Sequence, residues 1–413
     1  MQDEKAIYDV RKLPFSQMIL LGMQHALAMF GATVLVPILT GLNVSVALFT
    51  AGVGTWIFHL ITKKKVPAYL GSSFAFIAPI SIVVEKMGIP AAQGGIIVAG
   101  LVYAAMAFII YLVGPKLINS LFPPIVTGPV IMVIGLTLAP VAIDMASGNL
   151  FVALVAILAA AFVSVFTRGF FRLIPVMMGL IAGYITALFV GIVDFTPLKE
   201  AAWFGLPNFT VPAINWSAIL MIAPVAIVSM VEHVGDILAI SATVGKGKEF
   251  VENPGIHLTM LGDGIATSVA GIFGGPPNTT YSENTGVLAL TKVYDSVVMR
   301  IAAVFALILS LVPKLGALIS TIPKPVIGGI SILLFGMIAS VGVRTMIENN
   351  VDLTKSRNLI IASVILVIGI GGATIHVGNL EFAGMGLAGL AGLVLNKLLP
   401  DNLGESSNNS VNF

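Results

Sequence analysis

The most constraining feature of this sequence is a series of long stretches without a charged side chain. The first runs from Leu13 to Thr62 and contains no Lys, Arg, Asp or Glu. Further stretches of this kind are 87–115, 117–143, 145–167, 173–193, 201–231, 325–343 and 358–380. Each is near or above the roughly 20 residues that cross the apolar core of a bilayer as a helix. The pattern predicts a polytopic membrane protein, and it excludes a soluble enzyme, a nucleic-acid-binding protein and a disordered chain.

Composition and charge placement refine this prediction. Of the 413 residues, 57% are hydrophobic and 10% are charged, whereas about a quarter of a soluble domain is charged. The chain has no cysteine, so we expect neither a disulfide nor a Cys-ligated metal. With about fourteen spans and a cytoplasmic N-terminus, the 21 Lys and Arg residues fall on the cytoplasmic side except for Lys86, Lys199, Lys314 and Lys324. Since Lys and Arg favour cytoplasmic loops, both termini are expected to be cytoplasmic.

Two pairs of similar segments indicate an internal repeat. Residues 123–136 (PPIVTGPVIMVIGL) match residues 324–337 (KPVIGGISILLFGM) in their Pro, Gly and apolar positions. Residues 72–74 (SSF) and 279–281 (TTY) form a looser pair, with two hydroxyl residues followed by an aromatic one. The members of each pair lie seven spans apart, and an odd number of spans reverses their orientation. The sequence therefore predicts an inverted-topology repeat, the usual architecture of secondary transporters.

Both members of the looser pair lie where the helical pattern is interrupted. Pro67 opens the stretch PAYLGSSFAF, and Pro276 and Pro277 precede NTTYSENTG. Pro removes a backbone donor and Gly is a poor helix former, so each stretch is expected to lead into a half-helix. Two half-helix N-termini would offer free N–H groups to the carbonyl oxygens of a planar polar ligand. Two re-entrant loops without a ligand would fit the same pattern, provided that protein or a wet cavity satisfies their backbone.

Three carboxylates lie inside apolar spans. Glu232 and Asp236 are four residues apart, which puts them on one face of a helix, and Glu283 lies at the start of the second half-helix. A buried carboxylate is costly unless it binds a proton, a partner or a ligand. Apart from Lys292 at the very end, no Lys or Arg lies in these spans, so proton exchange or binding of ligand N–H groups is favoured over an ion pair. The ligand pattern does not fit Ca²⁺ or Zn²⁺, and no metal is expected.

Other polar residues carry weaker signals. Gln24 and His25 lie in the middle of the first span, where they either support the site or hold the helices together. His233 points away from the two carboxylates of its own helix and is expected to contact a neighbouring helix. Asp263 is expected to cap a broken helix, and Asn284 to fix the second half-helix. The remaining histidines are expected at the membrane interface: His59, His257 and His376.

At these motifs the sequence resembles the nucleobase–cation symporters of the nucleobase–ascorbate transporter family, which include uracil and purine permeases. The resemblance covers nearly the whole chain, and PAYLGSSFAF is similar to the uracil branch in particular. The matching segments are QHALAMFGATVLVP (24–37), PAYLGSSFAF (67–76), EHVGD (232–236), NTTYSENTGVLALTK (278–292) and PKPVIGGI (323–330). It implies an all-α polytopic membrane protein of 14 transmembrane segments in two inverted repeats of seven, with short antiparallel strands in segments 3 and 10.

The resemblance also implies a division into a core domain and a gate domain. Segments 1–4 and 8–11 would form the core domain, and segments 5–7 and 12–14 the gate domain. Along the chain, the expected parts are a cytoplasmic N-terminal segment (1–14), core (15–114), gate (115–200), core (201–313), gate (314–400) and a cytoplasmic C-terminal tail (401–413).

Residue by residue, the resemblance implies a substrate site at the two half-helices. Glu232 and Glu283 look like the two substrate-binding glutamates. The backbone at Phe74 and Ser282 would supply amide donors, and Tyr281 would lie beside the substrate.

The resemblance also assigns coupling and supporting roles. Asp236 occupies the position implicated in proton coupling, with Glu232 beside it. The supporting positions are Gln24, His25, Ser73, Asn284 and Phe335. The chain departs from the family pattern in three places: some uracil permeases have His at position 236, Ser282 replaces a glycine, and Phe335 replaces a tyrosine of the gate domain.

These observations predict a proton-coupled secondary transporter that imports a nucleobase by alternating access. Uracil is favoured, and a purine such as xanthine or uric acid is the alternative. An anion transporter or channel of the same architecture fits less well because glutamates, not cations, lie at the half-helices. A membrane-embedded enzyme would need a nucleophile–base pair or a metal set, and none is evident. We expect no cofactor other than the coupling proton, no nucleic-acid partner, a place in the inner (plasma) membrane, and a homodimer as a candidate assembly.

Overall fold

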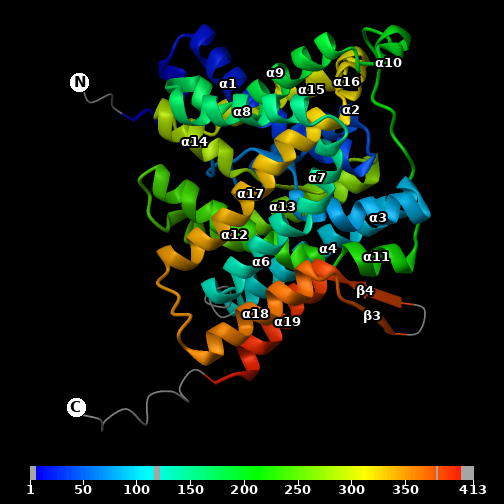
Figure 1. The fold of residues 1–413 in the computed structure, drawn as a ribbon. Helices are drawn as coiled ribbons and strands as arrows, with labels where there is room; N and C mark the ends of the chain where they lie inside the picture. Colours follow the sequence, from blue (N-terminus) through cyan, green and yellow to red (C-terminus); the bar gives the residue numbers. More distant parts are fainter. Residues whose placement is uncertain (1–5, 116–120, 378–379, 401–413) are drawn as a thin grey trace, which may run out of the picture.

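The computed structural model describes residues 6–115, 121–377 and 380–400, and within them the chain is predominantly helical (Figure 1). The helices form two groups. The group that we call the strand-bearing group contains α1 (Phe15–Thr40), α2 (Val44–Ile61), β1 (Leu70–Ser72), α3 (Ile77–Met87), α4 (Ile89–Val113), α11 (Trp216–Ile222), α12 (Val225–Thr243), α13 (Ile256–Phe273), β2 (Asn278–Thr280), α14 (Ser282–Thr291), α15 (Val297–Ser310) and α16 (Pro313–Ser320).

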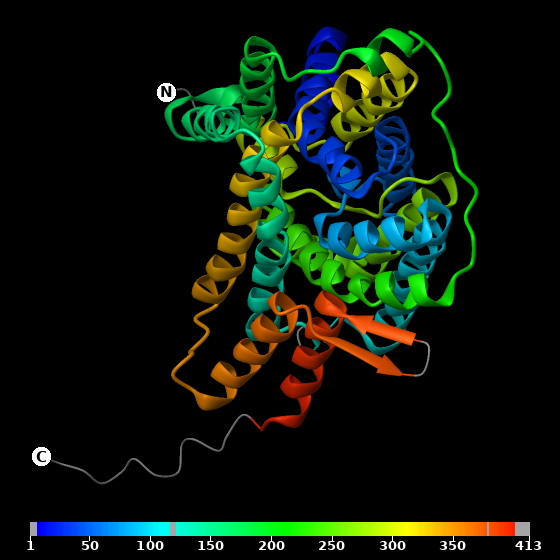
Figure 2. The same ribbon diagram turned by 45° about the vertical axis from the view of Figure 1, so that its right-hand side comes forward.

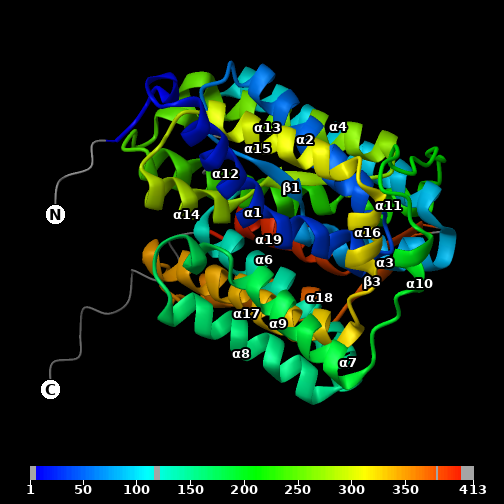
Figure 3. The ribbon, with the colours of Figure 1, turned by 90° about the horizontal axis from the view of Figure 1, so that it is seen from above.

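The second group, called the opposing group, contains α6 (Pro124–Thr137), α7 (Ala139–Ser147), α8 (Leu150–Phe166), α9 (Pro175–Val190), α17 (Lys324–Glu348), α18 (Ser356–Ile370) and α19 (Gly384–Leu398). A short helix, α10 (Thr196–Glu200), and an extended connection to α11 run along the outside of the molecule and join the two groups (Figure 2). Seen from above, α2, α4, α13 and α15 lie along one side of the molecule, and α7, α8, α9 and α17 along the other (Figure 3).

The helices follow the charge-free stretches of the sequence. Within the described residues, seven helical segments are long and apolar enough to cross a membrane, or eight if α15 and α16, bent by 81°, count as one span. Four further apolar helices are shorter, namely α8, α9, α18 and α19. The described part of the chain therefore confirms a polytopic helical membrane fold. Full-length helices do not reach the predicted number of fourteen, because several segments are short or interrupted.

Two three-residue strands meet between the half-helices. β1 and β2 pair antiparallel, with Leu70 opposite Thr280 and Ser72 opposite Asn278. This pairing confirms the short antiparallel strands predicted for segments 3 and 10. A 3₁₀ turn and α3 follow β1, and α14 follows β2. The two half-helices therefore start at opposite ends of one short ladder, each after the last residue of its strand.

Hydrogen bonds that flank the strands define how the two halves correspond. The Ser73 amide donates to the Pro277 carbonyl (2.8 Å), and the Tyr281 amide donates to the Tyr69 carbonyl (3.2 Å). The two bonds are equivalent if Ser73 corresponds to Tyr281, and hence Phe74 to Ser282. The sequence comparison had paired Phe74 with Tyr281, so it is wrong by one residue.

Helix α13 does not break at Asp263, as the sequence had suggested. The residue lies in the middle of a continuous helix and is fully buried, so the expected capping role is wrong. The glycines of this stretch instead permit close contact with α4. A Cβ atom on Gly264 would lie 2.6 Å from Tyr103 Cβ and 2.8 Å from the Gly100 carbonyl oxygen, distances that real side chains do not tolerate.

The segment before α1 packs against the strand-bearing group. Ile7 forms a bridge with the loop after α14: its amide donates to the Lys292 carbonyl (2.9 Å), and its carbonyl accepts from the Tyr294 amide (2.8 Å). The Tyr8 hydroxyl bonds to the C-cap carbonyl of α12 (2.9 Å), and Val10 is fully buried. Residues 1–5 and the expected C-terminal tail, 401–413, lie outside the described residues.

Two further features differ from the expectations. His59 is buried, with Nε2 3.0 Å from the Ala68 carbonyl oxygen, so its interfacial assignment is wrong. An unpredicted hairpin, formed by β3 (Thr374–Val377) and β4 (Leu380–Ala383), separates α18 from α19. His257, in the first turn of α13, is partly exposed and its ring lies 5.5 Å from that of Tyr111, while the side chain of His376 lies outside the described part.

Candidate functional site

The polar residues singled out from the sequence gather around the two strands. Helix α12 packs against β2, α14 and the 3₁₀ turn Phe74–Phe76. It carries Glu232 and Asp236, while Glu283 lies in the first turn of α14. The centre of the strand-bearing group therefore combines carboxylates with two helix starts.

The two carboxylates of α12 have different surroundings. Asp236 is buried, and its Oδ2 accepts a hydrogen bond from Thr280 Oγ1 at 3.2 Å. Glu232 is partly exposed, and its Oε2 is buried without a hydrogen-bond partner among the described residues. Because an unpartnered buried acceptor is unfavourable, Glu232 is the carboxylate that is free to accept a hydrogen bond from a ligand.

The two half-helices begin without side-chain caps. Ser73 precedes the 3₁₀ turn at Phe74, and Tyr281 precedes α14, and neither side chain caps the helix that follows. The first N–H groups of a helix have no partner within the helix. The amides of Phe74 and Ser282 are therefore suited to donate to a ligand. The side chain of Ser282 lies outside the described part of the chain.

Tyr281 is buried and fixes the geometry of this region. Its hydroxyl donates to the Ser72 carbonyl at 2.8 Å, so its ring lies across β1. A Cβ atom on Gly71 would lie 2.5 Å from two carbons of this ring and 2.9 Å from Thr33 Oγ1. Glycine at position 71 is thus required by the close approach of Tyr281. The adjoining Ser73 hydroxyl lies 3.3 Å from that of Ser229 on α12.

Asn284 joins the start of α14 to its surroundings. This fully buried side chain bonds to His25 Nδ1 of α1 and donates to the Pro67 carbonyl at 3.3 Å. The half-helix that carries Glu283 is therefore attached both to α1 and to the chain entering β1. Glu283 itself is exposed. Gln24, next to His25, has a buried Oε1 without a hydrogen-bond partner among the described residues.

A second polar cluster lies behind Asp236. His233 is fully buried, with Nδ1 2.7 Å from Asp263 Oδ2 and Nε2 2.9 Å from Thr259 Oγ1. The prediction that His233 contacts a neighbouring helix is confirmed. Thr280 connects this cluster to Asp236, since its Oγ1 also lies 3.4 Å from His233 Nδ1. The sequence analysis missed Asp263 as a partner, although a lone carboxylate in an apolar helix is itself a signal.

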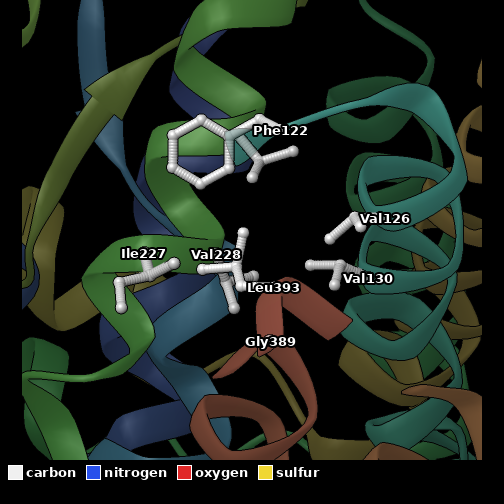
Figure 4. Close-up of a pocket in the computed structure, with 8 residues that line it drawn as sticks. Phe122, Val126, Val130, Ile227, Val228, Gly389 and Leu393 are labelled. Atoms are coloured by element: carbon white, nitrogen blue, oxygen red, sulfur yellow. The ribbon is translucent and has the colours of Figure 1, made fainter. Parts of the chain in front are cut away.

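The boundary between the two helix groups is apolar beside the site. A small crevice lies between α12, α6 and α19, and its lining contains no polar side chain (Figure 4). The lining residues are Phe122, Val126, Val130, Ile227, Val228, Val231, Gly389 and Leu393. Val228 lines the crevice and lies one helical turn before Glu232 on the same face of α12, so the apolar boundary adjoins the carboxylate. Phe335 is buried in α17, and its carbonyl packs against Gly135 of α6.

The described residues contain no group of three His, Asp or Glu side chains that would hold a metal ion. What the arrangement does offer is a set of acceptors and donors for one small polar ring. Glu232 and Glu283 supply carboxylate oxygens, and the two uncapped helix starts supply N–H groups. Asp236, paired with Thr280, lies one helical turn away.

Comparison with known proteins agrees with this architecture. A family model described as "Permease family", Xan_ur_permease, matches residues 16–378. The uracil permease of Bacillus caldolyticus is 48% identical over 413 residues, which cover 96% of this chain and 95% of the relative. The uracil permease of Bacillus subtilis (strain 168) is 45% identical and covers 99% of both chains. That of Escherichia coli (strain K12) is 43% identical and covers 95% of this chain and 93% of the relative.

Solved structures of other transporters share the fold. SLC26A9 superposes with a TM-score of 0.73 at 12% identity, covering 95% of this chain and 66% of that protein. The transmembrane domain of the cyanobacterial bicarbonate transporter BicA superposes with a TM-score of 0.65 at 14% identity, covering 95% and 99%. At such low identity the likeness concerns the fold alone.

Proposed function

The chain belongs to the permease family whose model spans most of its length, and on that premise we propose that it is a proton-coupled importer of uracil. It is a multi-pass membrane transporter and not an enzyme. The uracil permeases described above support uracil as the substrate, because they match nearly the full chain at more than 40% identity. The single observation that carries the chemistry is the meeting of Glu232, Glu283 and two uncapped helix starts around one strand pair.

The chemistry of uracil matches these groups. The ring has two N–H donors and two carbonyl acceptors, which alternate around one small ring. Carboxylate oxygens of Glu232 and Glu283 would accept from the N–H groups, and the amides of Phe74 and Ser282 would donate to the carbonyls. Hydrogen bonds to an ionised carboxylate are shorter and stronger than those between neutral groups, so such a site would select for the N–H pattern of the base.

Asp236 is the proposed coupling group. It is buried, it lies on the face of Glu232, and a hydroxyl from β2 contacts it. A carboxylate in this position would take up a proton from one side of the membrane and release it on the other, so that a neutral base moves with a proton. Thr280 belongs to β2, which leads into the half-helix that carries Glu283. The same strand would therefore connect the group that binds the proton with the half-helix that binds the base.

Alternating access would come from movement of the strand-bearing group against the opposing group. The apolar crevice beside Glu232 supports this, because its lining side chains are apolar and form no side-chain hydrogen bonds that movement would have to break. The distribution of Lys and Arg supports a cytoplasmic location for both termini, because these residues favour cytoplasmic loops. Import would then carry the base from the face of Lys86 and Lys314 to the face of Lys63 and Arg300.

Uptake of radiolabelled uracil tests the proposal. The chain is expressed in cells that lack their own nucleobase permeases, with the same cells carrying an empty vector as control. We expect saturable uptake that a protonophore abolishes, and competition by unlabelled uracil at much lower concentrations than by xanthine or uric acid. If unlabelled xanthine or uric acid competes more strongly than unlabelled uracil, the protein is a purine transporter. Uptake that the protonophore leaves unchanged would contradict proton coupling.

A further inference from the structure

One threonine side chain satisfies both backbone groups of a residue in β1. The amide of Leu70 donates to Thr55 Oγ1 at 3.0 Å, and the same hydroxyl donates to the Leu70 carbonyl at 3.4 Å. Thr55 lies on α2, the helix that precedes β1, and both residues are fully buried. The first residue of the strand is thus attached to a rigid helix through a single side chain.

The same arrangement occurs in the second half of the chain. The amide of Asn278 donates to Thr267 Oγ1 at 3.2 Å, and this hydroxyl donates to the Asn278 carbonyl at 2.9 Å. Thr267 lies on α13, the helix that precedes β2, and it is fully buried. Leu70 and Asn278 are each the first residue of their strand. The contact therefore occurs once in each repeat, at corresponding positions.

The register of the strands explains why these two residues need a partner. In an antiparallel pair, residues that exchange hydrogen bonds alternate with residues whose backbone groups point away from the partner strand. The bonds from Ser73 to Pro277 and from Tyr281 to Tyr69 mark the exchanging positions, so Leu70 lies at a position that points away. A buried backbone group without a partner is costly, and at membrane depth the protein itself must supply that partner.

The two contacts lie close to the proposed binding amides. Leu70 is opposite Thr280, two residues before Ser282, and Asn278 is opposite Ser72, two residues before Phe74. Each threonine therefore holds the start of its own strand and, across the ladder, the end of the other strand. Since each half-helix begins where a strand ends, a shift at either threonine would displace the amide on the opposite strand.

We propose that Thr55 and Thr267 are positioning residues that set the geometry of the substrate-binding amides. Neither hydroxyl is available to touch the substrate, because each is occupied by two backbone groups of a strand. A hydroxyl is required, since it donates one hydrogen bond and also accepts. Valine has nearly the same shape but can do neither. The inference rests on the proposed uracil site, and it adds the requirement that positions 55 and 267 carry a hydroxyl group.

The test compares valine and serine variants at the two positions. Thr55→Val and Thr267→Val remove the hydroxyl, while Thr55→Ser and Thr267→Ser retain it. Thr62→Val is the matched control, because Thr62 is a fully buried threonine at the end of α2 whose hydroxyl, among the described residues, bonds only to the Phe58 carbonyl of its own helix. Uracil affinity is measured on the purified proteins. Hydrogen exchange is measured on substrate-free protein, in peptides that cover 69–74 and 277–283.

We expect each valine variant to lose about tenfold or more in uracil affinity, because two buried backbone groups lose their partner. Hydrogen exchange should become faster in the peptides that cover 69–74 and 277–283 and should be unchanged in the other peptides. The serine variants and Thr62→Val should resemble the wild type in both measurements. Valine variants with wild-type affinity and wild-type exchange would overturn the proposal, and so would serine variants that are as impaired as the valine variants.

Exchange in the wild-type protein separates this inference from the proposed function. The measurement uses no ligand. If the wild-type protein fails to bind uracil, the proposed substrate is refuted. If hydrogen exchange in its strand peptides is nevertheless slow, and the valine substitutions accelerate it, the positioning role is retained. If the valine variants do not fold, hydrogen exchange in the wild-type protein still tests whether the threonines hold the strands. Strand peptides that exchange as fast as the connection between α10 and α11 would show that the threonines do not hold the strands.

Discussion

Replacing Glu232 with glutamine tests whether this carboxylate accepts a hydrogen bond from the substrate. The structure makes the substitution informative, because Glu232 Oε2 has no hydrogen-bond partner among the described residues. Glutamine has almost the same shape, so little packing is lost, and Oε2 loses no hydrogen bond to the described residues. A change in affinity can then be assigned to the ligand and not to the fold.

The expected loss follows from the energy of one hydrogen bond to a charged group. Such a bond contributes about 1.5–3 kcal/mol, which corresponds to about a 10- to 150-fold change in the dissociation constant. The upper part of the range applies if the glutamine amide turns its N–H₂ toward the ring N–H, which would place two donors in contact. The melting temperature of the substrate-free protein should not fall, because the free carboxylate is not stabilised by an internal donor.

Isothermal titration of purified protein with uracil measures the affinity, and a thermal melt without uracil measures stability. Glu200→Gln is the matched control: this glutamate is exposed at the end of α10, outside the site, and its loss should leave both values unchanged. Unchanged uracil affinity in Glu232→Gln would refute the ligand role. A large drop in melting temperature would show that Glu232 serves the fold instead.

Two further predictions concern coupling and the backbone donors. Asp236→Asn mimics the permanently protonated side chain, so it should exchange uracil in counterflow yet fail to accumulate it in proteoliposomes with an imposed pH gradient; full accumulation would remove Asp236 from coupling. Ser282→Pro deletes the N–H at the start of α14 and should abolish uptake, whereas Ser282→Ala keeps that N–H and should retain it. Equal uptake by the two Ser282 variants, at equal amounts in the membrane, would mean that this amide does not bind substrate.

The features that the sequence predicted correctly are those with local causes. Charge-free stretches set the membrane helices, and Pro67 and the Pro276–Pro277 pair mark where helices give way to strands. The i, i+4 spacing of Glu232 and Asp236 places them on one face whatever the helix packs against. Such patterns need no knowledge of the partner elements, so the helical membrane fold and the interrupted stretches that lead into half-helices could be derived from local sequence. The antiparallel strands were implied by the family resemblance.

The features that escaped prediction depend on how distant elements meet. Asp263 contacts His233 only because α12 and α13 pack at a particular rotation and height, and neither is encoded in the local pattern. The glycines beside Asp263 suggested a break, but they serve the close contact with α4. Likewise, the pairing of Ile7 with the loop after α14 joins segments that lie before the first span and after the tenth, and no local sequence pattern predicts it.

The repeat is symmetric in its backbone but not in its acidic groups. Each half contributes one strand, one threonine contact and one uncapped helix start. The correspondence that pairs Phe74 with Ser282 places Ala75 opposite Glu283. Backbone donors therefore come from both halves, while the carboxylate acceptors come from the second half alone. Under the proposed function, this asymmetry gives a bound ring one preferred orientation, because a ring turned about the pseudo-two-fold axis would face the Ala75 side chain, which offers its N–H groups no acceptor.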